Sequence, residues 1–215
     1  MALNLVYAGT MEEGRKYTRK FQSFSLSLNE NMFSWDELPI KGAGGITLLK
    51  CAKGQNHIMY GIGTKRLDAP SFKQLWSEFG AFIKANPAAN SSTFLVETFA
   101  QQGINALPDA YDAFPHRGGI EHLVEFEIAF DDKTVSAAGD AFAKRWRDHF
   151  AKPNISGYPI THVYQNYAHG DEPLSQLYGR DKWRQKRLTE LKNKFDPKGV
   201  FNAYHAIPSK LSDWS

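Results

Sequence analysis

Hydrophobic and polar residues alternate along this chain with two different periods, which separate helices from strands. Apolar side chains recur every three to four residues over residues 71–85 and 138–149, which predicts two amphipathic helices. Strict alternation with β-branched and aromatic residues predicts strands over residues 92–99 and 121–130, and residues 3–9 also have the pattern of a strand. Because these elements follow no regular βαβ repeat, we expect an α+β fold with helices covering one face of an antiparallel sheet.

The two ends of the chain carry clear boundary signals. Thr10 followed by Glu13 is typical of a capping box, and it predicts a helix over residues 11–21. The aromatic pattern of residues 162–167 predicts a strand, and residues 181–195 predict a last helix that Asp196 and Pro197 end. We therefore expect the C-terminal part of the chain to be a strand followed by a helix.

Composition narrows the classes of protein that fit. The chain has 215 residues, of which 42% are hydrophobic and 13% aromatic, enough for a buried core. The net charge is +3, and the one basic stretch is residues 180–198. Because this stretch also has an apolar side, its basic residues are best explained as the solvated face of an amphipathic helix, so we expect no nucleic-acid partner. Cys51 is the single cysteine, which excludes an intrachain disulfide and indicates a structural thiol.

Other patterns argue against membranes and metals. The sequence has no apolar run of about 18 residues, and its start lacks the pattern of a signal peptide. We expect a soluble protein, with secretion left open if the full-length protein carries a leader. The histidines have no metal-ligand spacing and no cysteine companions, so no metal site is predicted.

The strand over residues 121–130 divides its side chains between two faces. One face is apolar and must pack on helices, whereas the other carries two carboxylates, Glu125 and Glu127. From alternation alone, the simplest interpretation is that both glutamates are exposed to solvent on a one-sided sheet. The alternative is that this second face lies against a ligand.

Several motifs occur in the order found in one enzyme family. Residues 114–119 read Phe-Pro-His-Arg-Gly-Gly, residues 164–167 read Tyr-Gln-Asn-Tyr, and Tyr-Gly at 178–179 and Asp-Pro at 196–197 follow. In these motifs the chain resembles the berberine-bridge-enzyme-like FAD-linked oxidases. The resemblance implies that residues 1–160 are the substrate-binding domain and residues 161–215 the C-terminal segment that returns to the flavin domain. It also implies that the N-terminal FAD-binding domain is absent from this chain.

The resemblance assigns roles to four residues. Glu125 falls where members that carry a glutamate use it as general base, and a tyrosine, here Tyr164, assists the removal of a proton from the substrate. Asn166 is expected to hydrogen-bond the polar edge of the isoalloxazine ring, and Tyr167 to line the flavin. Leu123 departs from the polar residue that some members have two positions before the base.

The resemblance also implies a reaction and its partners. The chain would be the substrate-binding and catalytic half of an FAD-dependent oxidoreductase that transfers hydride from an alcohol, amine or sugar-like substrate to flavin, with molecular oxygen as acceptor. Its partner would be the missing FAD-binding domain or chain, and without it we expect this chain to be inactive and to bind FAD weakly or not at all. The alternatives are a non-catalytic α+β ligand-binding module and a truncated fragment that has lost flavin binding.

Overall fold

A computed structural model describes residues 2–24, 27–45 and 53–214, and the chain forms two compact units, Met1–Gly54 and Gln55–Ser215. The helices of the first unit are α1 (Met11–Thr18), a 3-10 turn (Arg19–Phe24), α2 (Leu38–Lys41) and a second 3-10 turn (Gly42–Gly45). Cys51, which we expect to be a structural thiol, lies outside the described residues. The boundary predicted between residues 160 and 161 falls inside the second unit and stays a prediction.

The first unit confirms the predicted helix start but not the predicted strand. The Thr10 hydroxyl accepts a hydrogen bond from the Glu13 backbone N–H at 3.2 Å, and the Glu13 carboxylate accepts one from the Thr10 N–H at 3.1 Å, which completes the capping box. Residues 3–9 are irregular, so that prediction was wrong. Leu3 and Val6 are 60% and 57% exposed, and the described part of this unit offers no strand with which they could pair.

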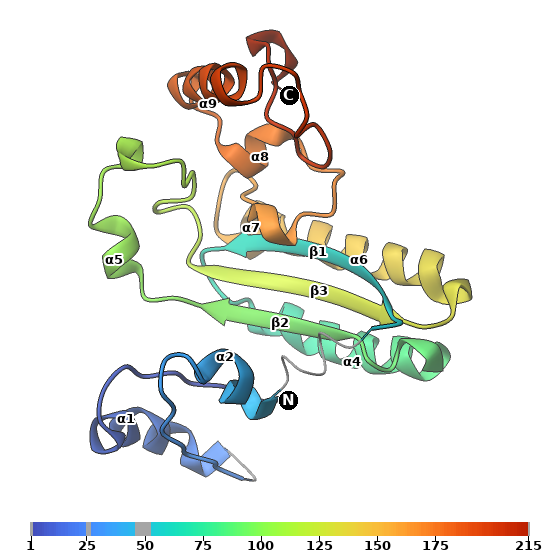
Figure 1. The fold of residues 1–215 in the computed structure, drawn as a ribbon. Coiled ribbons are helices and arrows are strands. Elements are labelled where there is room, and N and C mark those ends of the chain that lie inside the picture. Colours follow the sequence, from blue (N-terminus) through green and yellow to red (C-terminus); the bar gives the residue numbers. More distant parts are fainter. Residues whose placement is uncertain (1, 25–26, 46–52, 215) are drawn as a thin grey trace. The chain divides into compact units, whose positions relative to one another are not determined.

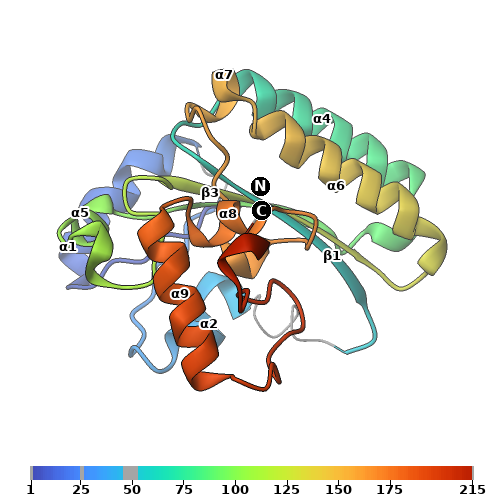
Figure 2. The same cartoon turned by 90° about the horizontal axis from the view of Figure 1, so that it is seen from above.

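The second unit is built on an antiparallel sheet (Figure 1). In the described residues the sheet has the strand order β1-β3-β2, and two long helices of the same unit cover one of its faces, as Figure 2 shows. The elements are β1 (Asn56–Thr64), α4 (Ala69–Ala85), β2 (Thr93–Thr98), β3 (His122–Phe130) and α6 (Ser136–Phe150). The predicted α+β fold is confirmed, although β1 was not predicted.

The core lies between the sheet and helices α4 and α6. Alternate residues of β3, Phe126 and Ile128 among them, are about 1% exposed on this face, and they meet the equally buried Trp146 of α6. Burying side chains of this size contributes about 1.5–3 kcal/mol each, which holds both helices on the sheet. The helix predicted over residues 71–85 is confirmed as α4, and Asp68 caps its start, because the Asp68 carboxylate accepts the backbone N–H of Ser71.

The C-terminal part lies beyond the β1 edge of the sheet (Figure 1). It contains α7 (Pro153–Ser156), a 3-10 turn (Gln165–Tyr167), α8 (Leu174–Tyr178), α9 (Lys182–Phe195) and a last 3-10 turn (Leu211–Asp213). Three shorter helical elements join the strands: a 3-10 turn (Pro87–Ala89), α5 (Gln101–Asn105) and a 3-10 turn (Asp109–Tyr111), and a further turn (Lys133–Val135) precedes α6. No helix in the described residues is long and apolar enough to cross a membrane.

The predicted strand over residues 162–167 was wrong. The backbone N–H of Tyr167 donates to the carbonyl of Tyr164 at 2.9 Å, which closes a 3-10 turn instead of pairing with a neighbouring strand. The last helix is confirmed, and Asp196 ends it. Phe201, which follows this helix, is 76% exposed.

Candidate functional site

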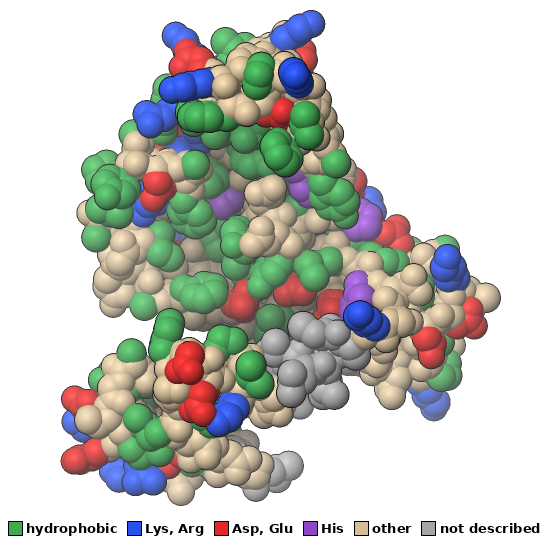
Figure 3. Space-filling model, viewed as in Figure 1, with side chains coloured by type: hydrophobic (Ala, Val, Ile, Leu, Met, Phe, Trp, Pro, Cys, Tyr) green, Lys and Arg blue, Asp and Glu red, His purple; other side chains and the backbone are tan. Residues whose placement is uncertain are grey.

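The candidate site lies on the face of the sheet that α4 and α6 leave uncovered. Three glutamates share this face: Glu125 and Glu127 on β3, and Glu97 on β2 opposite Leu123. Figure 3 looks onto this face and shows acidic side chains gathered over the strands. Glu125 is 7% exposed and Glu127 is 8% exposed, so the interpretation that both are solvated was wrong.

The sheet itself holds the carboxylate of Glu127. His57 of β1 contacts one oxygen through Nδ1 at 2.9 Å, and the hydroxyl of Thr93 on β2 donates to the other at 3.1 Å. Both neighbouring strands therefore fix this side chain, which is the usual way to offset the cost of burying a carboxylate. Glu127 therefore has a structural role on the sheet face that also carries Glu125.

Tyr167 lies on the sheet beside Glu125. Gly61 of β1 pairs with Glu125, and a Cβ added to Gly61 would stand only 2.5 Å from the Cβ of Tyr167. The Tyr167 hydroxyl donates to Glu97 on β2 at 2.8 Å. Because β3 lies between β1 and β2, the Tyr167 side chain crosses the strand that carries Glu125.

The surroundings of Tyr167 keep its hydroxyl protonated. Burial raises the pKa of Tyr167 above its usual value, and the hydrogen bond to Glu97 and the nearby charge of Glu125 raise it further. A phenol with a raised pKa donates a hydrogen bond and does not lose its proton to water near neutral pH. Its proton therefore points to Glu97, and its oxygen keeps lone pairs for another group.

Tyr164 and Asn166 join the site through Tyr167. The Asn166 amide donates to the Tyr164 hydroxyl at 2.9 Å, and the rings of Tyr164 and Tyr167 meet edge to face with centroids 5.4 Å apart. Asn166 is exposed and Tyr164 is half-buried. The structure thus brings the four predicted residues, Glu125 included, into one neighbourhood, although a turn and not a strand does so.

Glu97 is the residue of this face that sequence reasoning missed. It falls on the predicted strand over residues 92–99, but no motif marks it there. Only the register of β2 against β3 reveals that it stands beside Leu123, two residues along β3 from Glu125 and on the same face. Its hydrogen bond with Tyr167 then joins residues 70 positions apart in the chain.

Backbone contacts fix the chain just before the Tyr164–Tyr167 turn. The backbone N–H of Gly63 on β1 donates to the carbonyl of His162 at 2.8 Å, and that of Lys65 donates to Ser156 at 2.7 Å. These bonds satisfy outward-facing groups of an edge strand, which would otherwise be open to another chain. The turn therefore starts from a fixed point on the edge of β1.

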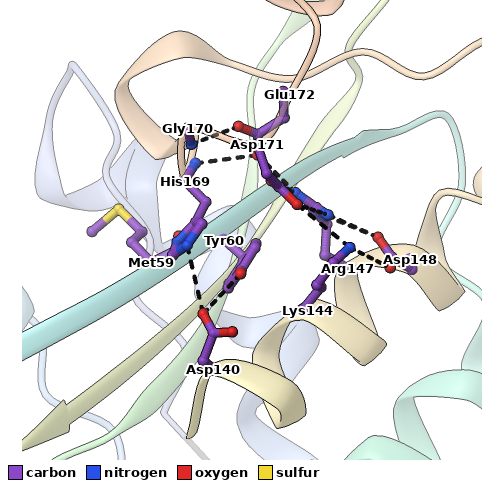
Figure 4. A network of polar contacts seen from close by, with 10 residues as sticks. All are labelled: Met59, Tyr60, Asp140, Lys144, Arg147, Asp148, His169, Gly170, Asp171 and Glu172. Atoms are coloured by element: carbon purple, nitrogen blue, oxygen red, sulfur yellow. Dashed lines mark hydrogen bonds and ion pairs between the residues drawn. The ribbon is translucent and has the colours of Figure 1, made fainter. Parts of the chain in front are cut away.

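An ion-pair network, which we call the Arg147 clamp, fixes the chain after the turn (Figure 4). Arg147 of α6 is 7% exposed and donates to Asp171 and to Glu172, each at 2.9 Å. Glu172 in turn accepts the backbone N–H groups of His169 and Gly170 at 3.1 and 2.8 Å. Arg147 lowers the pKa of Asp171 to about 2, since its guanidinium stabilises the carboxylate.

His169 connects the clamp to the sheet. Its ring stacks on Tyr60 of β1 with centroids 3.9 Å apart, and its Nδ1 contacts the carbonyl of Met59 at 3.1 Å. The Tyr60 hydroxyl donates to Asp140 of α6 at 2.8 Å, while the Arg147 guanidinium lies 4.7 Å over the Tyr60 ring. Burial raises the pKa of Tyr60, and the hydrogen bond to Asp140 raises it further. Tyr167 is therefore held at both sides of its turn.

The Phe-Pro-His-Arg turn precedes β3 and packs tightly. His116 is 2% exposed, and burial lowers its pKa to about 4, with a smaller contribution from the nearby His162. Arg117 contacts the carbonyl of Ile104 and the carboxylate of Asp112. In the described residues no group of three or more histidine, cysteine or acidic side chains could hold a metal ion.

Comparisons with known proteins agree with these motifs. A family model described as "Berberine and berberine like" matches residues 163–208. The FAD-linked oxidoreductase srdI of Neurospora crassa is 34% identical over 176 residues, which cover 81% of this chain and 34% of the relative. The FAD-linked oxidoreductase OXR1 of Pyricularia oryzae is 34% identical over 174 residues, which cover 80% of this chain and 34% of that relative.

Solved structures show the same fold at low sequence identity. A BBE-like protein of Arabidopsis thaliana matches with a TM-score of 0.65 at 15% identity, over 94% of this chain and 45% of that one. A carbohydrate oxidase of Microdochium nivale, solved with a substrate analogue, matches with a TM-score of 0.62 at 16% identity, over 95% of this chain and 44% of that one. The chain spans about a third of the length of the two curated relatives above. Residues 163–208 thus match the berberine and berberine-like family, and over the residues that it spans the chain is similar to FAD-linked oxidoreductases.

Proposed function

We propose that this chain supplies the substrate-binding and catalytic face of an FAD-dependent oxidoreductase that removes hydride from an alcohol, amine or sugar-like substrate. One observation carries the proposal: a buried carboxylate, Glu125, lies under a tyrosine on the sheet face that the helices leave uncovered. A buried carboxylate beside a phenol is suited to removing a proton from a hydroxyl or amine. The names of the relatives, all FAD-linked oxidoreductases, support the same class of reaction.

The Tyr164–Tyr167 turn fits a flavin ring in its chemistry. Asn166 is exposed, and a primary amide has two N–H donors and one acceptor, of which one donor serves Tyr164. The remaining groups match the polar edge of an isoalloxazine, and the rings of Tyr164 and Tyr167 offer apolar surface beside it. A bound flavin would accept the hydride. We propose that the groups binding the rest of FAD lie in sequence outside this chain, in a partner domain.

We assign the proton step to Glu125. Its carboxylate would take the proton of the substrate hydroxyl or amine, while Tyr167 shields it from water. The Tyr164 hydroxyl already accepts a hydrogen bond from Asn166, so its own O–H is left to orient the substrate. Molecular oxygen would reoxidise the cofactor in the complete protein.

The contact between Tyr167 and Glu97 supports a second assignment of the proton step. A Tyr167 oxygen that accepts the substrate proton could pass its own proton to Glu97 along the 2.8 Å hydrogen bond. The raised pKa of Tyr167 prevents a free phenolate, so this route needs Glu97 as the receiving group. The two routes use different carboxylates, which makes them separable by substitution.

The test uses the full-length protein loaded with FAD and measures anaerobic reduction of the flavin by substrate in a stopped-flow instrument. Glu125→Gln should slow reduction by about a hundredfold or more, the usual scale for loss of a general base. Glu127→Gln is the matched control, because Glu127 lies two residues away on the same face but is bound to His57 and Thr93. Its reduction rate should stay within about threefold of the wild type.

Two results would change the proposal. A Glu125→Gln protein that reduces its flavin normally, while Tyr167→Phe and Glu97→Gln are both slow, would move the base to the tyrosine and Glu97. A full-length protein that binds FAD but is reduced by none of the alcohols, amines and sugars tested would favour a ligand-binding module without catalysis. Oxygen consumption in the same samples reports whether oxygen is the acceptor.

A further inference from the structure

Gly61 is an unusual residue for the middle of a buried strand. It lies in β1 opposite Glu125, on the sheet face that α4 and α6 leave uncovered, and it is buried. Glycine weakens a strand, because it has no side chain to pack and more backbone entropy to lose. Within strands it commonly marks a place where another backbone approaches closely.

The approaching backbone is that of Tyr167. A Cβ built on Gly61 would stand 2.5 Å from the Tyr167 Cβ, 2.8 Å from its carbonyl oxygen and 3.3 Å from its carbonyl carbon. Real side chains do not tolerate the two shorter distances, and of the two Tyr167 atoms one is the backbone carbonyl oxygen and the other is Cβ, which does not move when the side chain rotates. A rotamer change at Tyr167 therefore cannot relieve the contact.

The turn that carries Tyr167 has little freedom to retreat. The backbone N–H of Tyr167 donates to the carbonyl of Tyr164, and the backbone N–H of Ala168 donates to the carbonyl of Gln165 at 3.2 Å. The Arg147 clamp holds the chain again from His169 onward. A side chain at position 61 would therefore lift the turn from the sheet or strain its bonds on both sides.

We propose that Gly61 is a positioning residue for Tyr167: by leaving no side chain on the sheet, it seats the tyrosine so that its hydroxyl reaches Glu97 and its ring crosses the strand of Glu125. Neighbouring strands are about 4.8 Å apart, so β1 and β2 lie nearly 10 Å apart, a distance that the Tyr167 side chain, its hydrogen bond and the Glu97 side chain bridge together. A hydrogen bond of 2.8 Å is lost once the turn rises by about 1 Å. The effect on catalysis rests on the proposed function, whereas the seating of Tyr167 does not.

The first test measures whether Tyr167 is in its place on the sheet, and it needs no flavin. Nuclear magnetic resonance of the chain with 13C-labelled tyrosine, assigned with Tyr167→Phe, follows the ionisation of Tyr167 with pH. We expect its pKa to lie above the usual value of about 10 in the wild type and to fall toward that value in Gly61→Ala. A folded Gly61→Ala chain in which Tyr167 titrates as in the wild type would overturn the proposal.

Two glycines provide matched controls. A Cβ at Gly139 in α6 would meet Ile128 at 2.7 Å, on the face of β3 that packs against the helices, so Gly139→Ala should disturb packing and leave the Tyr167 pKa unchanged. A Cβ at Gly80 in α4 would meet nothing within 4 Å, so Gly80→Ala should change neither. If Gly61→Ala fails to fold, the wild type still decides: nuclear Overhauser contacts between Gly61 Hα and Tyr167 Hβ are expected, and their absence would refute the seating.

The second test is made in the full-length, FAD-loaded protein. Gly61→Ala should slow flavin reduction in the wild-type background and change it little in a Tyr167→Ala background, because a residue that acts through the Tyr167 side chain has no further effect once that side chain is gone. An equal loss in both backgrounds would refute action through Tyr167. If the full-length protein shows no flavin reduction at all, the proposed function fails, while the titration of Tyr167 still decides the role of Gly61.

Discussion

The Arg147 clamp offers the sharpest prediction about stability. We consider Arg147→Met, which keeps much of the apolar length of the side chain but removes the guanidinium from between Asp171 and Glu172. The arginine is 7% exposed, and the Glu172 side chain is only 2% exposed. Removing one partner of a buried ion pair leaves an uncompensated charge, which typically costs 3–5 kcal/mol. We expect Arg147→Met to lower the free energy of unfolding by about 3 kcal/mol or more.

The pH dependence of this loss follows from Asp171. Its pKa is lowered to about 2 in the folded chain, so its contribution is complete above the unfolded value of 3.8 and is lost as the pH falls toward 2. The full difference corresponds to about 2.4 kcal/mol. The side chain is 35% exposed, however, so solvent screening reduces the expected share to about 1 kcal/mol. In Arg147→Met this contribution of Asp171 to the free energy of unfolding, and its loss at acid pH, should be absent.

Urea unfolding followed by tryptophan fluorescence measures both effects, because the buried Trp146 is the sequence neighbour of Arg147 in α6. The matched control is Lys186→Met, since Lys186 is 67% exposed and lies 4.0 Å from Glu190 in a surface pair that should contribute little. Adding Glu172→Gln to Arg147→Met should recover part of the loss by removing the buried charge. A loss below about 1 kcal/mol, or no recovery in the double variant, would refute this account of the clamp.

Two further predictions concern other parts of the chain. His116 has its pKa lowered to about 4 by burial, so wild-type stability should fall by up to about 3 kcal/mol as the pH drops from 6.5 to 4, while the unfolded chain takes up the proton. His116→Gln should remove that slope in urea titrations at several pH values, and an unchanged slope would contradict the assignment. Thr10→Ala should reduce the hydrogen-exchange protection of the first amides of α1 about fivefold, whereas Thr10→Ser should preserve it, because only the hydroxyl caps the helix.

Periodicity predicts the elements whose side chains meet a large apolar core. The strand that became β3 and the helix that became α6 were found because Phe126, Phe142 and Trp146 recur at the spacing that burial demands. β1 was missed although Tyr60 and Ile62 are just as buried, since Gly61 and Gly63 remove the polar half of the alternation. Those glycines reflect contacts made by distant parts of the chain, which no local pattern reports.

The strand predicted over residues 162–167 was wrong for a related reason. Their aromatic alternation is that of a strand, but strand formation needs a partner with free backbone groups, and here the edge of β1 bonds only to the carbonyl of His162 before the chain turns. The Tyr164–Tyr167 turn then brings Tyr164, Asn166 and Tyr167 together by folding back on itself. Sequence thus named residues that lie together in the structure, but it did not predict the geometry that joins them.

The same distinction explains what could be known of the candidate site. Alternation placed Glu125 on the face away from the helices, where the simplest interpretation was exposure to solvent, and the family resemblance gave it a role; the structure shows that it is buried. Burial and the neighbour Glu97 depend on the register of β2 and β3 and on the turn that carries Tyr167 across them. A carboxylate in water is an ordinary acid, whereas one under a tyrosine on a sheet is placed to take a proton. The chemical argument for Glu125 therefore rests on Tyr167, and the placement of Tyr167 rests on the missing side chain of Gly61.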